Sequence, residues 1–257
     1  MRILSDYAAN FAPKKRGMVV KNLTRLRQFD LPANRKAFLK LPERVFRNTG
    51  SEHATTPSDA LRVMLALAVR LLTVSALRAD NLVGLEVNRH LVEHRRGRAR
   101  VWHIVIPGEN TKNGAPFEKA LSEDTSRLLD TYLRIYRSQI SASPGQWLFP
   151  GPTGRRSTVP FSSLITKFVQ RETGIIMNVH LFRHLVSKFH GKLHPNDIET
   201  VRRILGHKSS ATTLRSYTEH RADEAFRRYD ETIATLTDEA NRLPPKKPHG
   251  RRGGDRK

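Results

Sequence analysis

The sequence contains no cysteine, which excludes disulfide bonds, thiolate nucleophiles, zinc ribbons and cysteine-ligated metal clusters. It also lacks a long uncharged apolar run. Residues 61–74 form the longest apolar stretch, but Arg62 and Arg70 interrupt it, and a membrane span needs about 20 apolar residues. Acidic residues are few, 24 against 46 lysines and arginines, so the net charge is +22. These shortages predict a soluble protein whose first candidate partner is nucleic acid and whose second is an acidic membrane surface.

The basic charge is concentrated at the two ends of the chain. Residues 1–50 contain 12 basic and 3 acidic residues, and residues 246–257 contain 6 basic and 1 acidic residue. The last segment mixes its charges with proline and glycine and has too little apolar surface to fold, so we expect disorder there. We therefore predict a basic N-terminal segment or linker over residues 1–50, a folded domain over residues 51–243 and a disordered basic tail over residues 244–257.

Apolar periodicity in the middle of the chain predicts mostly helices. Thr56 and Pro57 favour a helix start, and the residues that follow are apolar almost all round, which is typical of a buried central helix. Residues 100–106 and 116–121 predict the two strands of a hairpin. The predicted fold class is mainly α with a small antiparallel β-sheet, an α+β fold. Further helical patterns occur at residues 161–172, 181–189, 198–205, 212–217 and 222–236.

Several polar motifs lie at the ends of the predicted helices and in the predicted hairpin. Arg78 directly follows the apolar central helix, and Lys112 lies near the tip of the predicted hairpin. In the second half, H-x-x-R-H occupies residues 180–184, L-G-H occupies residues 205–207, and a tyrosine follows ten residues after the last histidine. The candidate site residues are Arg78, Lys112, His180, Arg183, His207 and Tyr217.

In their order and spacing these six residues resemble the tyrosine recombinase, or phage-type integrase, family over about residues 55–225. The resemblance implies an integrase-like catalytic domain at residues 51–243, with residues 1–50 as a linker or a truncated core-binding region. It implies an enzyme that cleaves and rejoins DNA at specific sites through a 3′-phosphotyrosyl intermediate, with no metal or nucleotide cofactor. It also implies that Lys112 gives a proton to the departing 5′ oxygen. The implied partner is double-stranded DNA, bound by a homotetramer at synapsed sites in the bacterial cytoplasm, at the nucleoid.

The chemistry of phosphodiester cleavage suits these residue types. A phosphodiester is anionic, so cations and hydrogen-bond donors must reach its non-bridging oxygens, and Arg78 and Arg183 can each grip them bidentately. His207 would add a further donor. The phenol of Tyr217 has a free pKa near 10 and needs a base to remove its proton, for which His180 is the candidate.

Alternatives remain open for individual residues. Lys119 is the alternative to Lys112 as the site lysine, and Tyr229 is the alternative to Tyr217 as the nucleophile. The two histidines of the 180–184 motif are spaced i, i+4, which can seat a metal ion on one helix face, although the glutamate of an HExxH motif is missing. A set of arginines that faces phosphate would also repel a divalent cation, which favours a site without metal.

Alternatives remain open for the function as well. The same residue types serve type IB topoisomerases, and an inactive integrase fragment would bind DNA through its backbone alone. The sequence departs from the family pattern in two places. Asn81 stands where the family commonly has an acidic residue, with Asp80 just before it, so either side chain is a candidate support for Arg78. Only about 50 residues precede the predicted catalytic domain, whereas the family normally has about a hundred.

Overall fold

The computed structural model describes residues 20–49, 56–96, 99–141, 143–194, 197–207, 209, 211, 213, 229–239 and 242. Residues 1–217 form one compact unit and residues 218–257 a second, in which residues 229–239 are helical. The predicted domain bounds, residues 51–243, stay a prediction, and the predicted tail over residues 244–257 lies outside the described residues. No described helix is long and apolar enough to cross a membrane.

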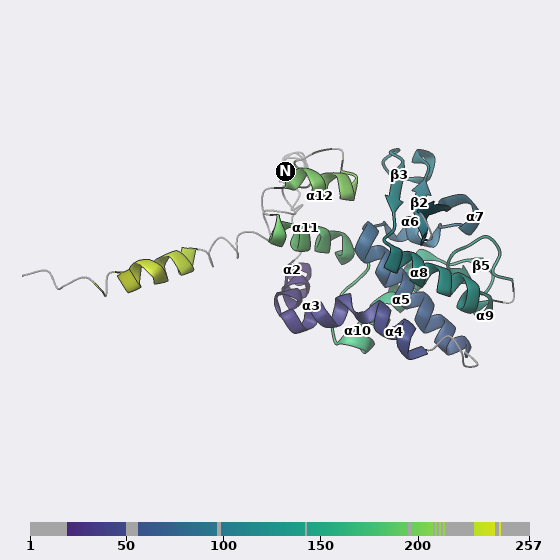
Figure 1. Ribbon diagram of the computed structural model, residues 1–257, viewed down its shortest axis with the longest axis horizontal. Helices are drawn as coiled ribbons and strands as arrows, with labels where there is room; N and C mark the ends of the chain where they lie inside the picture. The colour runs from purple at the N-terminus through teal and green to yellow at the C-terminus, as the bar shows by residue number, and fades with distance from the viewer. Residues whose placement is uncertain are drawn as a thin grey trace, which may run out of the picture. The chain divides into compact units, whose positions relative to one another are not determined.

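A long buried helix, α5 (Pro57–Ser75), crosses the centre of the first unit (Figure 1). Its start is the predicted one. The Thr56 hydroxyl accepts a hydrogen bond from the Asp59 amide at 3.2 Å, and the Asp59 carboxylate accepts one from the Thr56 amide at 3.2 Å. The helix ends at Ala76, whose left-handed backbone (φ 50°) stops the α-helical pattern two residues before Arg78.

The first unit also contains a three-stranded antiparallel sheet, in the order β1 (Leu91–Arg96), β2 (Ala99–Ile106) and β3 (Phe117–Ala120), whose central strand contacts α8 (Glu123–Thr131). The sequence predicted β2 and β3 but not β1, where charged residues obscure the apolar alternation. In the central strand, Ile104 pairs with Leu91 on one side and with Lys119 on the other. The β2–β3 loop, residues 107–116, therefore lies at the opposite end of the sheet from the β1–β2 turn.

Short helices connect these parts, and two longer helices, α10 (Thr158–Thr173) and α11 (Leu181–Leu193), complete the unit together with α12 (Ile198–Leu205). Ser122 caps α8, because its hydroxyl accepts a hydrogen bond from the Thr125 amide. The remaining elements are α6 (Ala79–Val83), α7 (Val87–His90), η2 (Gly108–Asn110), the π-helical η3 (Tyr132–Tyr136), α9 (Arg137–Ile140) and the strand pair β4 (Pro150–Gly151) and β5 (Gly154–Arg155).

Helices formed by residues 20–49 pack directly on this framework. They contact α5, α10 and α11, and Figure 1 shows α3 and α4 on the side of α5 away from the sheet. The prediction for residues 1–50 is a basic segment or linker, or a truncated core-binding region. Within residues 20–49 the apolar side chains that are spaced among the basic residues enter the main core. These elements are α2 (Val20–Arg27), η1 (Gln28–Asp30), α3 (Pro32–Leu39) and α4 (Leu41–Thr49). Their buried side chains are Leu26, Phe29, Phe38, Leu41 and Val45.

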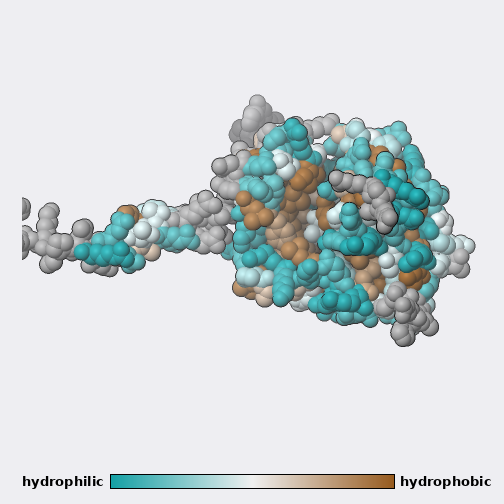
Figure 2. Space-filling model, viewed as in Figure 1, coloured by the Kyte–Doolittle hydropathy of each residue, from teal (hydrophilic) through white to brown (hydrophobic). Residues whose placement is uncertain are grey.

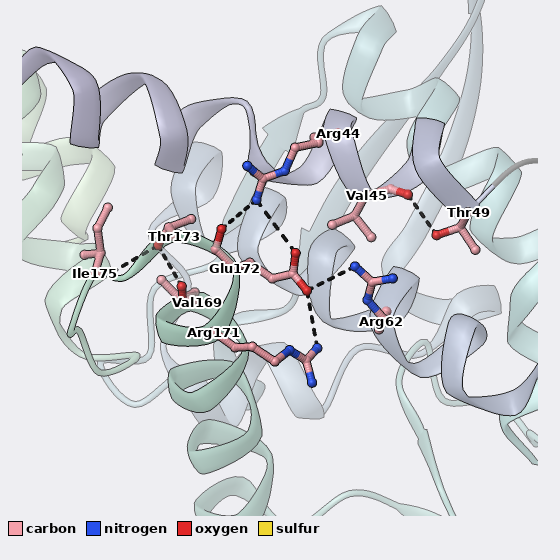
Figure 3. Close-up of polar contacts among 9 residues, drawn as sticks. All are labelled: Arg44, Val45, Thr49, Arg62, Val169, Arg171, Glu172, Thr173 and Ile175. Atoms are coloured by element: carbon pink, nitrogen blue, oxygen red, sulfur yellow. Dashed lines mark hydrogen bonds and ion pairs between the residues drawn. The ribbon is translucent and has the colours of Figure 1, made fainter.

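An ion-pair cluster fastens α4 and α5 to the end of α10 (Figure 3). Glu172, whose side chain is only 14% exposed, accepts from the Arg62 guanidinium at 3.1 Å. Its carboxylate lies 3.7 Å from Arg44 and 3.4 Å from Arg171, and Arg44 also donates to the Glu172 carbonyl oxygen at 2.7 Å. We call these four residues the Glu172 cluster. It places one carboxylate among three guanidinium groups, so their positive charge is partly balanced.

A second, smaller core holds α12 against α11 and the end of α5. Val201 and Leu205 are buried against Ala76, with Val186 and Ile198 packed beside them. Figure 2 shows hydrophilic residues over most of the visible face and apolar residues concentrated near α11 and α12. The consequence for the site is that the end of α5, just before Arg78, meets the end of α12, just before His207.

Candidate functional site

Arg78 lies beside a small cavity at the end of α5. Its backbone is extended (φ −69°, ψ 151°) at the N-cap position of α6, and its side chain is partly buried. The cavity has a volume of about 70 Å³ and is lined by Arg78, Asn81 and Arg183, among others. Ala76 is the one non-glycine residue with positive φ among the described residues, and this left-handed turn brings Arg78 to the cavity.

Arg183, on the first turn of α11, joins the ends of two other helices. Its Nη1 donates to the carbonyl oxygen of Ala76 at 2.7 Å, and its Nη2 donates to the carbonyl oxygen of Leu205 at 2.5 Å. Burial and, after it, the positive charge of Arg78 lower the pKa of Arg183 to about 10, which leaves the guanidinium protonated at neutral pH. Two positively charged arginines therefore share one partly buried site, where they repel each other.

His180 stands at the N-cap position of α11, and its ring meets that of His184 edge-on at 5.1 Å. Partial burial, followed by the charges of Arg183 and Arg78, lowers the pKa of His180 below its usual 6.5. The imidazole is therefore neutral at pH 7 and able to accept a proton. Within the described ranges, no group of three or more His, Asp or Glu side chains is placed to hold a metal ion.

His207 follows α12 and is positioned by its neighbours. Its Nδ1 lies 2.9 Å from the hydroxyl oxygen of buried Thr213, which leaves Nε2 for another partner. Partial burial, Arg183 and Arg78 also lower the pKa of His207. The same two arginines thus act on both histidines, and these four predicted site residues share one electrostatic environment.

The turn that carries His207 is held by charged side chains of α12. Gly206 has a left-handed backbone (φ 59°), and Arg202 donates from Nη1 to the His207 carbonyl oxygen at 2.9 Å. Glu199 in turn accepts from Nε and Nη2 of Arg202, each at 2.7 Å, and from Arg203 at 2.9 Å. These bonds lower the pKa of Glu199 to about 2. The backbone of the L-G-H turn is therefore fixed by side chains as well as by the helix.

Lys112 is exposed in the β2–β3 loop, near the same cavity. The residues on either side of it, Thr111 and Asn113, line the cavity together with Arg78 and Arg183. In the part of the chain that the structure describes, the Lys112 side chain has no ion-pair or hydrogen-bond partner. Its rival Lys119 lies on β3 and does not line the cavity.

The structure describes only one of the two candidate tyrosines. Tyr217 lies outside the described residues. Tyr229 is described, belongs to the helical residues 229–239 of the second unit and is 61% exposed. Both tyrosines therefore remain candidates on sequence grounds.

Asp80 and Asn81 are the two candidates to support Arg78, and in the part of the chain that the structure describes neither makes a hydrogen bond or ion pair with it. Asp80 accepts a hydrogen bond from the Thr158 hydroxyl at 2.6 Å, and its carbonyl oxygen accepts from Arg155 at 3.3 Å. Asn81 lines the cavity. The Asp80 carboxylate is thus used to connect α6 with the start of α10.

Sequence reasoning did not single out Asn113, Arg202 or Arg203. The spacing of Glu199 with the two arginines, i to i+3 and i+4, is a helical ion-pair pattern that indicates their contact. No comparable pattern indicates Asn113, because its partner Gly206 lies 93 residues away.

Comparisons with known proteins agree with this architecture. Residues 45–224 match the family model of the phage integrase family. Among solved structures the chain is similar to XerH site-specific recombinase, in a post-cleavage complex with palindromic difH substrate, at 18% identity and a TM-score of 0.55, over 77% of this chain and 52% of that one. It is also similar to XerA recombinase, at 17% identity and a TM-score of 0.51, over 87% of this chain and 66% of that one.

These likenesses confirm the predicted fold class, a mainly helical recombinase domain with a small antiparallel sheet. The chain spans about half the length of the XerH chain and about two thirds of the XerA chain. No curated protein sequence matches it.

Proposed function

Because this chain belongs to the phage integrase family, we propose that it is a site-specific DNA recombinase that cleaves and rejoins strands by transesterification. The observation that carries the proposal is the shared site of Arg78, Arg183, His180 and His207. Among the described residues no carboxylate pairs with either arginine there, and both arginines lower the pKa of both histidines. Such a site has unbalanced positive charge and suits a phosphodiester.

The two arginines supply the electrostatic part of the reaction. The transition state carries more charge on the non-bridging oxygens than the ground state, so guanidinium donors aimed at those oxygens lower the barrier. Arg183 gives one N–H of each Nη to a carbonyl oxygen and keeps its other N–H groups for phosphate. Nε2 of His207 adds a donor to the same oxygens.

The bond changes follow from the proposed roles. The Tyr217 phenol gives its proton to neutral His180, and its oxygen forms a bond to phosphorus while the bond from phosphorus to the 5′ oxygen breaks. Lys112 gives a proton to the departing oxygen, which leaves a 5′ hydroxyl, a neutral amine and a 3′-phosphotyrosine. Attack by a 5′ hydroxyl of another strand reverses these transfers and restores the enzyme.

The proposed partner is double-stranded DNA. The net charge of +22 supports a polyanion, and the XerH relative was solved with a DNA substrate. We further propose that four copies act together on two synapsed sites, as the family resemblance implies.

Trapping of a covalent complex tests the proposal. The probes are nicked duplexes that tile the DNA flanking the gene. A nick just 3′ of the cleavage point lets the short released fragment, which carries the new 5′ hydroxyl, diffuse away and prevents rejoining. We expect one of them to give a protein–DNA adduct stable in denaturant, followed by strand transfer to a second duplex. An adduct without transfer between duplexes would favour a topoisomerase-like enzyme. Binding without any adduct would leave a DNA-binding fragment and would refute the proposed activity.

A further inference from the structure

The β2–β3 loop that carries Lys112 is braced internally. The Thr111 amide donates to the Gly108 carbonyl oxygen at 3.0 Å, and the Gly114 amide donates to the Thr111 carbonyl oxygen at 3.2 Å. The Thr111 hydroxyl lies 2.9 Å from the Gly108 carbonyl oxygen and 2.7 Å from that of Ala115. A Cβ on Gly108 would lie 2.5 Å from the Gly114 carbonyl oxygen, so only glycine permits this closure. The loop therefore holds its shape, and a single attachment can fix its tip.

Asn113 provides that attachment. Its Nδ2 donates to the carbonyl oxygen of Gly206 at 2.8 Å. Asn113 is partly buried, whereas Lys112 beside it is exposed. Gly206 is the C-cap residue of α12 and directly precedes His207. One side chain thus connects the loop of Lys112 to the turn of His207.

The turn at residues 205–207 has each of its three carbonyl oxygens held by a different side chain. Arg183 holds that of Leu205, Asn113 that of Gly206 and Arg202 that of His207. Arg183 and Arg202 come from α11 and α12, which also pack together through apolar side chains. Of these three side chains, Asn113 is the one that comes from the β2–β3 loop.

We infer that Asn113 is a positioning residue that sets the place of Lys112 relative to the phosphate bound by Arg183 and His207. The inference rests on the proposed function, in which Lys112 protonates the departing 5′ oxygen. Lys112 has no side-chain partner of its own among the described residues, so its backbone decides where its ammonium group can reach. The Asn113 bond fixes that backbone one residue away.

A change of leaving group separates this role from a general structural one. Sulfur in place of the bridging 5′ oxygen leaves as a thiolate and does not need a proton from Lys112. In single-turnover assays on the duplex that wild type cleaves, we expect Asn113→Ala to slow cleavage about tenfold, since it removes one hydrogen bond. On the sulfur-containing duplex we expect Asn113→Ala within about twofold of wild type. Lys112→Ala should show the same pattern with a larger loss.

Asn110→Ala is the matched control, because Asn110 lies in the same loop but contacts Arg89 instead of the L-G-H turn. It should cleave both duplexes like wild type. An equal loss for Asn113→Ala on both duplexes, or no loss on either, would overturn the inference. If wild type forms no adduct with any duplex, the proposed function fails instead.

Hydrogen exchange tests the attachment without relying on activity. In the full chain without DNA, Asn113→Ala should speed amide exchange of Thr111 and Gly114, whose amides are bonded within the loop, and Asn110→Ala should not. Unchanged exchange in Asn113→Ala would show that the Gly206 bond does not hold the loop, and the inference would be wrong whatever the activity.

Discussion

Two groups of arginines in this protein differ in how their charge is balanced. In the Glu172 cluster three guanidinium groups surround a carboxylate that is 14% exposed, and they join α4, α5 and α10 (Figure 3). At the end of α5, Arg78 and Arg183 share a cavity, and among the described residues neither has a carboxylate partner. Arg183 instead donates to two backbone carbonyl oxygens.

The difference distinguishes a structural cluster from a binding site. The partly buried carboxylate of Glu172 offsets part of the repulsion among the three arginines, and its ion pairs hold them in place. Arg78 and Arg183 repel each other, and an anion such as phosphate would relieve that repulsion. The lack of a carboxylate partner among the described residues, more than the number of arginines, therefore indicates where DNA backbone is expected to bind.

Replacement of arginine by lysine should separate the two groups most strongly. We expect Arg183→Lys to lower single-turnover cleavage about a hundredfold or more, because an ammonium group cannot reproduce bidentate donation to phosphate. Arg62→Lys, in the Glu172 cluster, is the matched control and should cleave within about threefold of wild type. Similar losses for both variants would show that charge balance does not mark the site.

Removal of the central carboxylate should affect stability and spare cleavage. We expect Glu172→Gln to lower the free energy of unfolding by about 1–3 kcal/mol, since three arginines lose their balancing charge. Urea unfolding measures this change. Asp124→Asn is the control, because its pair with Arg127 is exposed and should be worth less than about 1 kcal/mol. A stable Glu172→Gln protein that fails to cleave would contradict the separation of the two clusters.

The smallest expected effect is on the histidines. Burial lowers the pKa of His180 and His207 first, and Arg183 and Arg78 lower it further. Removal of the Arg78 charge should therefore raise both pKa values, so each imidazole stays protonated to a higher pH in Arg78→Gln. Titration of the imidazole NMR signals in the free protein measures this change, with Arg62→Gln as the control. Unchanged or lower pKa values would mean that Arg78 does not act on the histidines.

Local sequence patterns predicted the elements whose signals are local. Thr56 and Pro57 with the apolar run behind them predicted α5, and the valine, tryptophan and isoleucine residues of 100–106 predicted β2. The packing of residues 20–49 was not predictable in this way. Their helices are short, and the burial of Phe29 and Phe38 depends on α10 and α11 far along the chain.

The candidate site also contains residues that local motifs predict and contacts that they do not. Arg78, Arg183, His180 and His207 were predicted from motifs, and the structure gives them one electrostatic environment. The bond from Asn113 to Gly206 spans 93 residues and that from Arg44 to Glu172 spans 128, and neither produces a periodic pattern in the sequence. Such contacts follow from tertiary packing, so they require a structure.

The most direct test of the central claim is the identity of the residue that carries the DNA. The account holds that phosphate bound by Arg78 and Arg183 is attacked by Tyr217. Protease digestion and mass spectrometry of the trapped adduct should locate the nucleotide on Tyr217, and Tyr217→Phe should form no adduct while it folds and binds DNA nearly as wild type does. A nucleotide on Tyr229, or on any other residue, would contradict the account.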